Sequence, residues 1–144
     1  MKSCAYCSKL EIKARTIISN DLAWAFPTNI PITPGHTLVA PKRCVEKLSD
    51  MTNEERSAVL ELADKVIAAL KEAYGAEGFN FAWNQGTLSG QGVPHFHLHI
   101  IPRKSGDTGL NGYDPRGFLY RTGDREPKKE YELLEVVEKI KACM

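Results

Sequence analysis

Short stretches rich in apolar residues, bounded by Pro, Gly, Asn or Asp, predict several β-strands in this chain, and one of them alternates strictly between polar and apolar residues. The stretches that predict strands are residues 15–26, 36–40, 79–83 and 95–101. The first divides into two strands around a turn at residues 20–21, while Pro41 and Pro102 end two of the others. The intervening segments 27–35 and 84–94 are rich in Pro, Gly or polar residues and predict loops.

Two longer stretches carry apolar residues at helical spacing. The first starts with Thr52 and Glu55, a pair that predicts a capping box, and runs to Tyr74, after which Gly75 and Gly78 favour a helix end. The second covers residues 128–142. Its spacing places four apolar side chains on the buried face: Leu133, Leu134, Val137 and Ile140.

Short connections between strands, two helices and no β-α-β alternation together predict an α+β fold with an antiparallel sheet of about five strands. A chain of 144 residues suits one domain, which we expect to span residues 1–144. Residues 105–127 predict mostly loop, with one short strand at 118–120.

Composition mainly excludes classes of function. A net charge of +1 gives no broad electrostatic case for binding nucleic acid or an anionic membrane, and no apolar run reaches transmembrane length. The first residues lack the apolar stretch of a secretory signal, so we expect a cytoplasmic protein. Reducing conditions there disfavour disulfides between its four cysteines: Cys4, Cys7, Cys44 and Cys143.

Three of the four histidines occupy alternate positions of the strand predicted at residues 95–101. His95, His97 and His99 would share one face of that strand, roughly 6.6 Å apart from one to the next. Folding alone does not require three imidazoles in a row, so the array suggests a functional site. Three readings stay open at this point: a satisfied buried polar face, a metal site, and nucleophilic or acid–base catalysis by imidazole.

The loop before these histidines favours catalysis, because Gly90 and Gly92 let backbone amides approach an anion. Residues 90–103, Gly-Gln-Gly-Val-Pro-His-Phe-His-Leu-His-Ile-Ile-Pro-Arg, resemble the signature of the histidine triad (HIT) family of nucleotide hydrolases and transferases. Residues 34–42 resemble the family segment that carries a fourth histidine. The resemblance covers about residues 4–103, and the tail after them is the variable part of the family.

The resemblance implies cleavage at the α-phosphate of a nucleoside phosphate derivative, a dinucleoside polyphosphate or a nucleoside phosphoramidate, with a purine base expected. His97 would attack and form a nucleotidyl-histidine, with its other ring nitrogen held by a backbone carbonyl. His99 would contact phosphate or bridging oxygens, and His36 would complete the polar cluster. Besides His97 and His99, the implied nucleotide-binding residues are Phe26, Thr28, Asn29, Asn84, Gly90, Gln91, Gly92 and Val93. A nucleotide-binding regulatory protein with little turnover is the alternative.

Two positions depart from the family pattern. Thr28 stands where the family usually has the Asp or Asn that holds the ribose hydroxyls, which weakens those contacts or transfers them to Asn29. Gly92 stands where many members have a Ser or Thr whose hydroxyl assists the leaving group, which disfavours efficient cleavage of amidates.

Cys4 and Cys7 have the spacing of half a zinc site, although a redox pair or two unrelated thiols would fit the same pattern. The resemblance to zinc-containing bacterial and archaeal members implies two further ligands, a residue after the Pro-Lys of residues 41–42 and the first triad histidine. Here these are Cys44, in place of the family's histidine, and His95, which predicts a structural Cys₃His zinc site.

The resemblance also implies a two-fold homodimer that pairs main helices and extends the sheet across its interface. In the family the C-terminal segment often reaches towards the partner's site. Arg116 and Arg121 are therefore candidates for tuning specificity.

Overall fold

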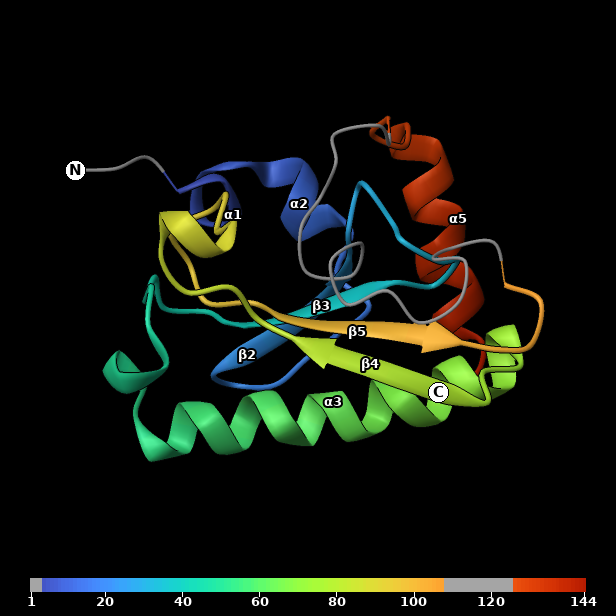
Figure 1. Cartoon of the computed structure of the whole chain (residues 1–144), viewed down its shortest axis with the longest axis horizontal. Coiled ribbons are helices and arrows are strands. Elements are labelled where there is room, and N and C mark those ends of the chain that lie inside the picture. Colours follow the sequence, from blue (N-terminus) through green and yellow to red (C-terminus); the bar gives the residue numbers. More distant parts are fainter. Residues whose placement is uncertain (1–3, 108–125) are drawn as a thin grey trace.

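The computed structural model describes residues 4–107 and 126–144 (Figure 1). Within these residues one antiparallel sheet has the strand order β1-β2-β3-β5-β4. Its strands are β1 (Ile18–Ser19), β2 (Ala23–Pro27), β3 (Thr37–Pro41), β4 (Gly78–Ala82) and β5 (Leu98–Arg103). The helices are α1 (Ala5–Ser8), α2 (Leu10–Ala14), α3 (Asn53–Tyr74) and α5 (Glu130–Lys141), with 3₁₀ turns η1 (Leu48–Asp50) and η2 (Thr87–Ser89). The predicted α+β fold with five antiparallel strands, a main helix and a C-terminal helix is confirmed.

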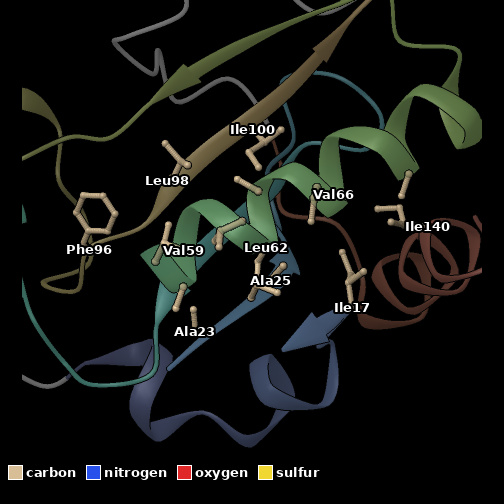
Figure 2. Packing of buried hydrophobic residues seen from close by; sticks show 14 of the residues in the cluster. Ile17, Ala23, Ala25, Val59, Leu62, Val66, Phe96, Leu98, Ile100 and Ile140 are labelled. Atoms are coloured by element: carbon tan, nitrogen blue, oxygen red, sulfur yellow. The ribbon is translucent and has the colours of Figure 1, made fainter. Parts of the chain in front are cut away.

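The sheet has a different cover on each face. Helices α3 and α5 pack on one face, where alternate strand residues such as Ala25, Val39 and Ile100 join the larger apolar core. Figure 2 shows Leu62 and Val66 of α3 in this core together with Ala25 and Ile100. The other face carries a smaller core of residues from α1, α2, β2 and β3: Cys4, Tyr6, Ile12, Trp24, Phe26, Leu38 and Ala40. Because side chains alternate along a strand, this second face also receives the histidine side chains.

The histidine strand begins later than the alternation predicts. Residues 95–97 lie outside β5, and Phe96 donates its backbone N–H to the Val45 carbonyl over 2.6 Å. The prediction of a strand from residue 95 was wrong because Pro41, at the end of β3, has no N–H for a ladder. The Pro41 carbonyl meets His95 Nε2 at 2.6 Å instead. At the other end Pro102 stays in the strand, since β4 pairs it with Phe79 beyond the last β3 partner.

The main helix matches its prediction closely. The Thr52 hydroxyl accepts from the Glu55 amide, and the Glu55 carboxylate accepts from the Thr52 amide, which makes the predicted capping box. Gly75 follows the helix with φ of +65°, a left-handed end that glycine adopts without strain. Gly78, also expected to help end this helix, is instead the first residue of β4.

Helix α5 buries a narrower face than the sequence predicts. Leu133, Val137 and Ile140 are buried, but Leu134 is 41% exposed, so its placement on the buried face was wrong. Val137 and Ile140 follow Leu133 at i+4 and i+7, which keeps all three on one side of the helix. Leu134 lies about 100° around the helix from Leu133 and therefore points away from that side.

Some segments differ from the expected structure, and others lie outside the described residues. Residues 5–14 form α1 and α2, which the sequence pattern does not predict, and Arg15 caps α2 instead of starting a strand. The short strand expected at 118–120 and the specificity candidates Arg116 and Arg121 lie outside the described residues. None of the helices within residues 4–107 and 126–144 combines the length and apolar composition needed to cross a membrane.

Candidate active site and metal centre

A cavity of about 390 Å³ opens on the sheet face covered by α1 and α2. His97 and His99 line it together with most of the residues implied in nucleotide binding: Phe26, Thr28, Asn29, Asn84, Gly90, Gly92 and Val93. Its lining combines apolar side chains with polar groups, which suits an aromatic base joined to phosphates.

His36 and His99 form a connected pair beside this cavity. The Ile32 amide donates to His36 Nδ1 over 3.1 Å, so that nitrogen carries a lone pair and Nε2 carries the proton. His36 Nε2 lies 2.9 Å from His99 Nδ1 and donates to it. His99 therefore holds its own proton on Nε2, which suits hydrogen bonding to a phosphate or bridging oxygen.

The fold brings this pair together through the sheet. Leu38 of β3 is the register partner of His99 of β5, and His36 directly precedes β3. The two imidazole centroids are 5.2 Å apart. His36 is 3% exposed, so the hydrogen bonds that set its tautomer are shielded from water.

His97 has a complementary arrangement. Its Nδ1 lies 2.8 Å from the carbonyl oxygen of His95, which can only accept, so Nδ1 carries the proton and Nε2 the lone pair. His97 as a residue is 8% exposed, and its ring packs edge-on against Tyr6 with centroids 5.2 Å apart. The backbone carbonyl expected to hold this ring is thus the one two residues before it.

The structure does not bring every expected nucleotide-binding side chain into this cavity. The Gln91 side chain accepts from the Gly86 amide at 2.8 Å, donates to the Glu46 carbonyl at 3.4 Å, and lines a separate cavity. Its loop neighbours Gly90 and Gly92 do reach the His97 cavity.

Other residues line the His97 cavity without having been expected there: Tyr6, Lys9, Ile12, Arg15, Lys128, Glu130 and Leu133. They come from the two ends of the chain, which meet where Arg15 Nε lies 3.4 Å from a carboxylate oxygen of Glu130. Tyr6 and Ile12 lie on helices of four and five residues, which are too short for a periodic pattern to mark them.

The four predicted metal ligands come together at one point. The sulfur atoms of Cys4, Cys7 and Cys44 and the ring nitrogen of His95 all lie within 4.8 Å of one another. His95 Nδ1 is 3.3 Å from Cys4 Sγ and 3.4 Å from Cys7 Sγ. A tetrahedral zinc ion with ordinary bond lengths separates sulfur and nitrogen ligands by about 3.5 Å, so these donors fit one.

The chemistry of the donor set supports the same fit. Because His95 Nε2 donates to the Pro41 carbonyl, Nδ1 faces the thiols with its lone pair. Burial lowers the pKa of His95, which keeps the ring neutral, as a metal ligand must be. Desolvation, together with hydrogen bonds to the other two thiols, raises the pKa of Cys44 to about 12. A bound cation would relieve this cost of thiolate charge, and this cluster could therefore bind a metal.

Comparison with known proteins adds three findings. An uncharacterised HIT-like protein of Mycoplasma genitalium is 34% identical over 134 residues, which are 92% of each chain. The bis(5'-nucleosyl)-tetraphosphatase (asymmetrical) of Schizosaccharomyces pombe is 37% identical over 106 residues, 74% of this chain and 58% of that protein. A zinc-bound histidine triad family protein from Mycobacterium smegmatis has a crystal structure with a TM-score of 0.68 at 26% identity, covering 99% of this chain and 98% of that one.

The HIT domain matches residues 9–106, well over half of the 144 residues. This range contains the histidine array, the loop before it and His36. The chain therefore belongs to the HIT-domain family.

Proposed function

We propose that this protein is a nucleotide hydrolase or transferase that cleaves a nucleoside phosphate derivative at the α-phosphate through a nucleotidyl intermediate on His97. The observation that carries the proposal is the fixed tautomer of His97, whose Nδ1 donates to the His95 carbonyl. A buried imidazole held in this way directs a lone pair, not a proton, at its substrate.

The reaction would proceed in two displacements. The Nε2 lone pair of His97 forms a bond to the α-phosphorus while the bond from phosphorus to the leaving oxygen breaks. The N–H of His99 Nε2, placed there by the His36 contact, donates a hydrogen bond to the departing oxygen, which leaves as a polyphosphate anion. Water then attacks the phosphorus and releases its proton to solvent, the bond to His97 breaks with its electron pair returning to Nε2, and the nucleoside monophosphate leaves.

The backbone around Gly90 and Gly92 would stabilise the non-bridging phosphate oxygens as negative charge develops. Phe26, buried at the end of β2, would pack on the base, with Thr28 and Asn29 beside the ribose and Asn84 beside the phosphates. Gln91 would contribute through its backbone, since its side chain is bonded to Gly86 and Glu46.

We propose a dinucleoside polyphosphate as the preferred substrate. The Schizosaccharomyces pombe relative is named for hydrolysis of such a compound. Gly92 offers no hydroxyl to assist an amine leaving group, whereas a polyphosphate leaves readily because its negative charge is delocalised.

We propose that the cluster of Cys4, Cys7, Cys44 and His95 holds zinc in a structural role. When bound, zinc supplies a closed cross-link between the N-terminal segment and the residues before β5, and no open coordination position. His95 also offers its carbonyl to His97, so the cross-link would steady the nucleophile. The expected two-fold homodimer stays a prediction.

A substrate panel with product identification tests the proposed activity. Diadenosine and diguanosine polyphosphates and a nucleoside phosphoramidate are offered to the wild type and to His97→Ala. We expect release of a nucleoside monophosphate from the polyphosphates and a loss of about a thousandfold or more in His97→Ala, with nucleotide binding retained. Tight mononucleotide binding by the wild type without turnover of any compound would instead favour a regulatory nucleotide-binding protein.

A further inference from the structure

Arg15 is a buried cation in the wall of the nucleotide cavity. Its side chain is 8% exposed, and its Nε donates to the Glu11 carbonyl at 3.2 Å and lies 3.4 Å from a carboxylate oxygen of Glu130. Within residues 4–107 and 126–144 its two Nη atoms make no hydrogen bond. The side chain as a whole is buried, but its Nη atoms are not enclosed, so their donors are available to a cavity ligand that presents acceptors.

The position of Arg15 indicates which part of a nucleotide it meets. Arg15 follows α2, and Glu130 begins α5, where Leu133 adds an apolar surface to the same cavity. In Figure 1, η2, which leads into the glycine loop, and α5 lie on opposite sides of α2. With the phosphates at the glycine loop and His97, the base extends towards α2 and α5.

We propose that Arg15 reads the edge of the base and selects guanine over adenine, with Glu130 holding the plane of the guanidinium; this inference rests on the proposed function. The two Nη groups form a fork that matches the adjacent O6 and N7 acceptors of guanine. Adenine presents an amino group in place of O6, which sets donor against donor and leaves one Nη group without an acceptor.

The face and the edge of the bound base would then be recognised by different groups. Phe26 and Leu133 accept the flat face of either purine, so they supply affinity without choice between the bases. Discrimination falls to the one group that distinguishes a carbonyl from an amino substituent. A single bidentate contact of this kind discriminates between bases by about tenfold or more.

The test compares guanine and adenine ligands on the intact protein. Calorimetry measures the Kd of GMP and AMP, and kinetics measures kcat/KM for diguanosine and diadenosine polyphosphates. We expect a guanine preference of about tenfold or more in the wild type, and its loss in Arg15→Met. Lys13→Met is the matched control, because Lys13 lies exposed on α2, outside this cavity, and its removal should leave the preference unchanged.

Three results would overturn the inference: no base preference or an adenine preference in the wild type, or an Arg15→Met variant that weakens both ligands equally. The last would show that Arg15 contacts phosphate or acts only on stability. Should Arg15→Met fail to fold, Glu130→Gln, at a side chain that is 45% exposed, must lower the guanine preference while preserving AMP affinity. Absence of turnover with guanine-selective binding would refute the proposed function but not this inference.

Discussion

Replacing Cys44 by alanine should strip the metal cluster of one of its four donors. The donor atoms of Cys4, Cys7, Cys44 and His95 lie within 4.8 Å of one another, and within residues 4–107 and 126–144 no other His, Cys, Asp or Glu belongs to this cluster. Cys44 is the position where the family usually has histidine, which makes it the most informative of the four. Water would have to take its place in the coordination shell.

The size of the effect follows from ordinary metal energetics. Structural zinc binding is worth about 10–16 kcal/mol, so an even share per ligand is about 3 kcal/mol, or about a hundredfold in Kd. With free metal in excess, this weakening removes about 2.7 kcal/mol of stabilisation. In a chain of this size the Tm of the metal-loaded protein should fall by about 10 °C.

The assay measures bound metal by elemental analysis after dialysis against buffered zinc, together with thermal unfolding. Cys143→Ala is the control, because Cys143 lies at the end of α5, outside the cluster. The wild type and the Cys143→Ala control should each hold one equivalent of zinc per chain. The reasoning is refuted if Cys44→Ala binds zinc as tightly as the wild type, or if the wild type binds none.

Three further predictions concern the surroundings of the site. Hydrogen bonds from Arg43 hold the pKa of Glu55 below its usual value, so their stabilisation is complete above the unfolded carboxyl pKa, about 4.3, and disappears as pH falls through the lower folded value. Glu55→Gln should therefore unfold at lower urea concentration than the wild type at pH 7, and the gap should close in acid. A gap independent of pH would contradict this. Gly35 has φ of +91°, and an added Cβ would stand 2.8 Å from the Tyr74 ring. Gly35→Ala should therefore lower the free energy of unfolding, measured with denaturant, by about 2–4 kcal/mol. A decrease under about 0.5 kcal/mol would count against this reasoning. His36→Phe should lower kcat about 10–100-fold with little change in nucleotide Kd, and an unchanged kcat would show that the pair of imidazoles is not used.

The sequence predicts the parts of this fold that local pattern determines. The capping box of α3 and the short apolar runs of β2 and β3 are local, and the histidine motif is recognisable because its residues are contiguous. The cluster formed by Cys4, Cys7, Cys44 and His95 could be anticipated from the family resemblance, because a ligand set can keep its geometry when thiolate replaces imidazole.

Other features depend on contacts between distant segments and could not be predicted in the same way. Helices α1 and α2 have four and five residues, too few for a helical period to show. The delayed start of β5 follows from Pro41, whose carbonyl is taken by the His95 ring. The place of Arg15 in the cavity depends on Glu130 of α5, which is 115 positions away along the chain.

The most direct test of the account is to trap the covalent intermediate. Wild-type protein is mixed with a dinucleoside polyphosphate, quenched within milliseconds under denaturing alkaline conditions, and weighed by mass spectrometry. We predict an added mass of one nucleoside monophosphate that maps to His97, is lost in acid, and is missing from His97→Ala. The same adduct forming at the wild-type rate in His97→Ala, or mapping to another residue in the wild type, would contradict the central claim.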